Sequence, residues 1–79
     1  MRSTVKMPRV AETTDEVVVS EWLVGVGDFV APNQVVARVE TDKALVEVSV
    51  PVGGVVLELL VDPDDEIRTG EPFIVLETS

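Results

Sequence analysis

The stretch Glu40-Thr41-Asp42-Lys43-Ala44 lies just past the middle of the 79-residue chain and separates two alternating runs, 35–39 and 45–50. Alternation of this kind is typical of β-strands. If Asp42 and Lys43 are the central residues of a tight turn, the runs form a hairpin with one apolar face. That face pairs Val39 with Val46, Ala37 with Val48 and Val35 with Val50, while Arg38 meets Glu47 on the other face. Because a one-residue slip would spoil both faces, Lys43 is predicted at a hairpin tip, clear of the core.

The rest of the chain has the composition of a β protein. It contains nineteen valines, one tryptophan and two phenylalanines, which favour many short, close-packed strands. No window of about 11 or more residues keeps a helical period free of glycine, proline or β-branched runs. Besides the hairpin, strands are predicted at 3–10, 17–24, 55–61 and 72–78, with short apolar contacts at 29–30 and at Ile67. Proline in Met7-Pro8 limits pairing and places the first strand at a sheet edge.

The two halves of the chain repeat at a spacing of 37 residues, so that residues 20–24 align with 57–61. At this spacing Asn33 falls on Gly70, and Asp64 falls on Gly27. Asparagine and aspartate are the non-glycine residues that best tolerate the left-handed conformation, so the turns can survive. The repeat predicts an all-β sandwich with pseudo-twofold symmetry. The counterpart of Lys43 would be residue 80, so the hairpin and the chain termini are predicted at opposite ends.

Charge and composition exclude several classes of function. The formal net charge of −9 argues against binding to nucleic acid or to an anionic membrane surface. No apolar run approaches the roughly 20 residues of a membrane span, and no signal peptide is visible. The chain has neither histidine nor cysteine, which excludes zinc sites and Ser-His or Cys-His nucleophile pairs. An EF-hand loop that starts at Asp62 would need glycine and glutamate where the chain has Ile67 and Phe73, so the acidic run 62–66 is predicted to be an acidic turn.

Three stretches resemble the lipoyl domain, the swinging-arm module of 2-oxo acid dehydrogenase complexes. They are Met7-Pro8 with Glu12 and Glu16, the run 21–30 with its Gly27-Asp28 turn, and Glu40-Thr41-Asp42-Lys43-Ala44 with Glu47-Val48. Departures from the family pattern are Ala11, Val17, Asn33 and Asp64, where glycines are customary. The resemblance implies one domain over residues 1–79, a flattened β-sandwich (a barrel-sandwich hybrid) of two antiparallel sheets.

The same resemblance implies a carrier role for Lys43. An exposed lysine lacks the burial or neighbouring cation that would make it a base or Schiff-base amine. It would instead be acylated by a lipoate ligase or lipoyl transferase and carry covalently bound lipoic acid, with Asp42 and Ala44 as flanking recognition residues. The arm would take an acyl group from a thiamine-diphosphate-dependent decarboxylase (E1) and pass it to coenzyme A at the acyltransferase core (E2). A flavin enzyme, dihydrolipoyl dehydrogenase (E3), would then reoxidise it.

The resemblance also bears on the surroundings of this module. The domain itself would be a non-catalytic carrier and part of a dihydrolipoyl acyltransferase. The loop 11–16 is a candidate docking surface for E1, although a plain solvated loop explains it equally well. A cytoplasmic location is expected, or the mitochondrial matrix in a eukaryote.

Other interpretations of the central motif remain open. A lysine beside an aspartate at a hairpin tip is, in isolation, most often only a solvated turn. A biotin carrier domain shares the fold, but that family favours methionines where this chain has Asp42 and Ala44. An unmodified sandwich that only binds partners predicts that Lys43 can be replaced without loss of function. Lys6, the only other lysine, is expected to be an ordinary strand surface residue, and Trp22 a core residue.

Overall fold

The computed structural model describes residues 1–10 and 15–78, which form eight β-strands and no helix. None of the described residues therefore forms a helix that could cross a membrane. The strands are β1 (Arg2–Lys6), β2 (Glu16–Trp22), β3 (Phe29–Val30), β4 (Val35–Glu40), β5 (Leu45–Ser49), β6 (Gly54–Leu59), β7 (Glu66–Arg68) and β8 (Pro72–Glu77).

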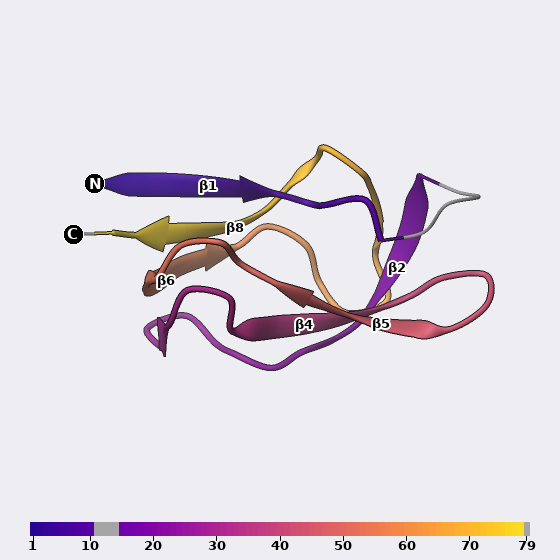
Figure 1. The fold of residues 1–79 in the computed structure, drawn as a ribbon, viewed down its shortest axis with the longest axis horizontal. Coiled ribbons are helices and arrows are strands. Elements are labelled where there is room, and N and C mark those ends of the chain that lie inside the picture. The colour runs from indigo at the N-terminus through magenta and orange to yellow at the C-terminus, as the bar shows by residue number, and fades with distance from the viewer. Residues whose placement is uncertain (11–14, 79) are drawn as a thin grey trace.

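The strands form two four-stranded antiparallel sheets, in the orders β1-β8-β6-β3 and β5-β4-β2-β7. The molecule is elongated, with extents of 36 × 18 × 17 Å. Both termini lie at one end, and the loop between β4 and β5 extends from the other end (Figure 1). This arrangement confirms the predicted all-β sandwich with the hairpin and the termini at opposite ends. β1 is an edge strand, as the proline that follows it predicts.

The central hairpin has the predicted register near its tip and a different one at its base. Ala37 pairs with Val48, Arg38 with Glu47, and Val39 with Val46. The predicted pairing of Val35 with Val50 is wrong, because Val35 pairs with Ser49 and the register shifts between Val35 and Ala37. Val36 is the extra residue of a β-bulge there. The bulge lets the neighbours Val36 and Ala37 both point into the core, where each is at most 1% exposed.

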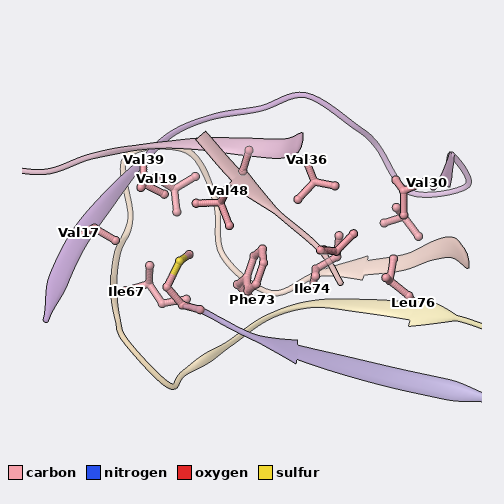
Figure 2. Packing of buried hydrophobic residues seen from close by; sticks show 14 residues of the cluster. Val17, Val19, Val30, Val36, Val39, Val48, Ile67, Phe73, Ile74 and Leu76 are labelled. Atoms are coloured by element: carbon pink, nitrogen blue, oxygen red, sulfur yellow. The ribbon is translucent and has the colours of Figure 1, made fainter. Parts of the chain in front are cut away.

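The core consists of apolar side chains from the inner faces of both sheets. Figure 2 shows valines of β2, β4 and β5 pointing toward Phe73, Ile74 and Leu76 of β8. Trp22 is only half-buried: its ring stacks on Phe73 with centroids 6.0 Å apart, and its Nε1 donates to the Val61 carbonyl at 2.9 Å. It packs against the core without being fully buried, so the prediction of a core tryptophan is confirmed in part.

The repeat in the sequence is a repeat in the structure. The register shift at Ser20 in β2 recurs at Leu57 in β6, and the shift at Val36 in β4 recurs at Phe73 in β8. Among the described residues, four positive φ angles follow the same spacing: 96° at Gly27 and 75° at Asp64, 67° at Asn33 and 91° at Gly70. Asparagine and aspartate therefore do replace glycine at left-handed turn positions, as predicted.

Most strands are shorter than the sequence pattern suggests. The first strand ends at Lys6 and not at Val10, and β6 ends at Leu59 and not at Val61. After Lys6, the chain contacts the β7–β8 turn, where the Met7 N–H donates to the Glu71 carbonyl at 2.8 Å. The apolar residues past these strand ends are used in loop packing, which a pattern of alternation cannot distinguish from a strand.

Candidate functional site

Lys43 lies at the tip of the β4–β5 hairpin, at the end of the molecule opposite both termini (Figure 1). Asp42, Lys43 and Ala44 are exposed, and Thr41 is half-buried at the base of the tip. Within the described residues no ion pair to the Lys43 ammonium is present. In the structure, all three of these residues therefore lie on one accessible turn, where the sequence predicts them.

Thr41 and Ala44 close the loop in an unusual way. The Thr41 N–H donates to the Ala44 carbonyl at 2.9 Å, as in a regular hairpin. The Ala44 N–H, however, donates to the Thr41 hydroxyl at 3.1 Å, and the Lys43 N–H donates to the same oxygen at 3.3 Å. That hydroxyl in turn donates to the Ala44 carbonyl at 2.9 Å. The threonine side chain thus connects both strands of the hairpin below the lysine.

The sequence of the tip accounts for this arrangement. Two-residue hairpin loops usually adopt turns with positive φ, which glycine or asparagine supplies. Neither Asp42 nor Lys43 has a positive φ. A threonine preceding the turn can instead accept backbone N–H groups through its side chain, and here the Thr41 hydroxyl does so.

A groove beside the tip carries a concentration of negative charge. Its lining includes the carboxylates of Glu16, Glu40, Asp42 and Glu66, with Val18 between them. Arg68 of β7 offsets part of this charge, since its Nε lies 3.2 Å from Glu16 Oε2. In the parts of the chain that the structure describes, no group of three or more side chains is placed to hold a metal ion.

The two lysines differ in their settings. Lys43 is on a protruding loop, whereas Lys6 ends the edge strand β1 and lies beside Pro8 and Pro51 in a shallow surface groove. An amine must reach into another enzyme's active site to be acylated there. The geometry at the tip fits a lipoyl or biotinyl group on Lys43, because the exposed amine projects from a loop that nothing else in the described chain covers.

Two features of this region were not predicted from the sequence. In the sequence, strand pairing alone explains the threonine at position 41, and only the structure shows that its hydroxyl bonds within the turn. The recurrence of threonine at the equivalent Thr78 is the sequence signal for such a role. Arg38 contacts not only Glu47, at 3.7 Å, but also Glu21 of β2, at 2.8 Å. The proposed docking loop 11–16 lies outside the described residues except for Asp15, which pairs with Arg9, and Glu16.

The sequence of this chain is similar to those of proteins with known roles. A family model described as "Biotin-requiring enzyme" matches residues 3–76. The acetyltransferase component of the pyruvate dehydrogenase complex from Haemophilus influenzae is 47% identical over 66 residues, 84% of this chain and 12% of that protein. The lipoamide acyltransferase component of the branched-chain α-keto acid dehydrogenase complex from Pseudomonas putida is 45% identical over 73 residues, 92% of this chain and 17% of that protein.

A solved structure agrees with these sequence matches. The lipoyl domain of the 2-oxoglutarate dehydrogenase complex from Azotobacter vinelandii superimposes with a TM-score of 0.73 at 27% identity, and covers 95% of both chains. This chain thus covers 95% of a solved domain but less than a fifth of the length of the two relatives above.

Proposed function

This chain belongs to the biotin- and lipoyl-attachment family and is a lipoyl domain, and from that premise we propose that Lys43 is the residue that carries the lipoyl group. The observation that supports this assignment is the placement of Lys43. It is an exposed amine at the tip of a loop, at the end of the domain away from the termini. Lys6, on the edge strand, has no comparable reach.

The reaction at Lys43 forms one amide bond. A lipoate ligase would use ATP to activate the lipoate carboxyl as an acyl adenylate, with release of pyrophosphate. Lys43 Nζ, after losing a proton to solvent, attacks the acyl carbon, and AMP leaves. The amide has no positive charge, so the domain becomes one unit more negative than its formal −9. Asp42 and Ala44, which flank the lysine with short side chains, leave the amine accessible and are proposed recognition residues.

Once attached, the lipoyl group supplies the dithiol–disulfide chemistry that carries acyl groups and electrons. The chain's own contribution is position. The hairpin holds Lys43 away from the body of the domain, and tethering keeps a high effective concentration of the group at each site within reach. The protein around this domain is proposed to be an acyltransferase (E2) of a 2-oxo acid dehydrogenase complex. Its partners would be the decarboxylase (E1), dihydrolipoyl dehydrogenase (E3) and a lipoate ligase or lipoyl transferase.

Intact-mass measurement after incubation with a lipoate ligase, lipoate and ATP tests the site. The wild-type domain is expected to gain one lipoyl group, and Lys43→Gln none. Lys6→Gln is the matched control, because it removes the other lysine and should be modified like the wild type. An adduct on Lys43→Gln would place the site elsewhere. Modification by a biotin ligase in place of the lipoate ligase would favour the biotinyl alternative.

A further inference from the structure

We propose that Thr41 is a positioning residue for the acylation of Lys43: its hydroxyl holds the tip in the conformation in which a modifying enzyme meets the lysine. The inference deepens the proposed function and rests on it. Thr41 does not touch the reacting amine, and it acts only through the backbone on either side of Lys43.

The hydroxyl of Thr41 makes three of the contacts that define the tip. It accepts the backbone N–H groups of Lys43, at 3.3 Å, and of Ala44, at 3.1 Å. It donates to the Ala44 carbonyl at 2.9 Å. Because one of these donors belongs to the lysine itself, the side chain fixes the direction in which the Lys43 backbone leaves the turn.

Besides the contacts of the Thr41 hydroxyl, the tip is held by the backbone bond from the Thr41 N–H to the Ala44 carbonyl, and not by burial. Asp42, Lys43 and Ala44 are exposed, so no core packing restrains them. The φ angles of Asp42 and Lys43 are not positive, so the loop lacks the turn types whose twist matches the flanking strands. A tip of this kind has many conformations available, and ordering it during binding would reduce the rate of modification.

The repeat provides an internal comparison for this role. Thr78, which is equivalent to Thr41, donates through its hydroxyl to the Met1 carbonyl at 2.9 Å, and its N–H donates to the same carbonyl at 2.7 Å. Met1 therefore stands where Ala44 stands in the hairpin. There, however, the Met1 amine donates to the Thr78 backbone carbonyl, at 2.6 Å. The bond from hydroxyl to carbonyl is common to both ends, whereas of these two threonines in the described chain only Thr41 also accepts backbone N–H groups through its hydroxyl.

The test compares three variants. Thr41→Val removes the hydroxyl and keeps the branched shape, Thr41→Ser keeps the hydroxyl, and Thr78→Val removes the equivalent hydroxyl at the other end. Initial rates of lipoylation by a lipoate ligase are followed by intact mass over a range of domain concentrations. Thr41→Val is expected to lower kcat/KM about tenfold, a change equivalent to about 1.4 kcal/mol. Thr41→Ser should stay within about threefold of the wild type, and Thr78→Val should match it.

Two further measurements separate positioning from folding and from the proposed function. The midpoint of thermal unfolding should fall in both Thr41→Val and Thr78→Val, since each loses a half-buried hydroxyl that donates to a carbonyl, and somewhat further in Thr41→Val, whose hydroxyl also accepts two N–H groups. Amide hydrogen exchange by NMR should show lost protection at Lys43 and Ala44 in Thr41→Val but not in Thr41→Ser. Equal lipoylation rates for Thr41→Val and wild type, or an equal slowing in Thr78→Val, would overturn the inference. If the wild type takes no lipoate, the proposed function fails, and unchanged exchange in Thr41→Val would then separately overturn the role of Thr41.

Discussion

The two ends of this molecule have equivalent backbone arrangements but different side chains. At the hairpin end, one register row crosses the sheet through Leu45, Glu40, Val18 and Glu66. At the end with the termini, the equivalent row is Arg2, Glu77, Val55 and Phe29. The first row lies beside an acidic groove and the lysine, whereas the second ends in a phenylalanine that is 68% exposed.

The comparison separates what the fold requires from what the function requires. The backbone bonds that hold the two halves together are the same: Val56 exchanges bonds with Gly27 and Asp28 at 2.8 Å, and Val19 with Asp64 and Asp65 at 2.7 and 2.9 Å. The fold is therefore compatible with either Glu66 or Phe29 at the end of a row. The carboxylate of Glu66 is therefore not required for the strand pairing of this row.

The largest effect is expected from a charge placed in the shared core. Val39 and its equivalent Leu76 are both fully buried. Val39→Asp and Leu76→Asp should each lower the free energy of unfolding by at least about 3 kcal/mol, because each buries a carboxylate that has no partner. Chemical denaturation followed by circular dichroism measures both. The two variants should be similarly unstable; a loss confined to one half would mean that the halves do not share one core.

A smaller effect is expected at the left-handed turns. An added Cβ at Gly27 or Gly70 would meet no atom within 4 Å, so a substitution there costs only backbone strain. Gly27→Ala and Gly70→Ala should each lower stability by about 1–2 kcal/mol. Gly70→Asn should cost clearly less, since Asn33 already occupies the equivalent position with a φ of 67°. Thermal unfolding of the three variants checks this, and equal losses for Ala and Asn at Gly70 would contradict it.

The symmetric frame could be predicted from the sequence because it depends on spacing and residue type. The repeat at 37 residues fixed which turns correspond, and the tolerance of Asn33 and Asp64 for positive φ followed from their chemistry. The bulge at Val36 does not follow from strict alternation, which pairs every residue of a strand in turn. Its signal was present, since two adjacent apolar residues recur at Val36-Ala37 and at Phe73-Ile74.

At the site, too, some features can be predicted from the sequence and others cannot. The exposure of Lys43 followed from the hairpin alone. The role of the Thr41 hydroxyl and the contact between Arg38 and Glu21 did not, because each joins groups whose distance depends on how strands lie in space. Side-chain hydrogen bonds of this kind carry no periodic pattern in a sequence.

The smallest effect is expected from Arg38, and it tests the comparison most directly. Arg38 lies between Glu21 and Glu47, and the equivalent Val75 lies between Glu58 and Thr4. The arginine ion pairs are roughly half exposed, with N–O distances of 2.8 and 3.7 Å. Surface pairs of this kind contribute little, so Arg38→Val should change the free energy of unfolding by no more than about 1 kcal/mol. Because salt screens such pairs, the wild type should lose more stability than Arg38→Val when denaturation is repeated at high salt. A large loss at low salt would mean that the ion pairs of Arg38 stabilise the hairpin end strongly, although the equivalent row at the other end has Val75 in that place and no such pairs.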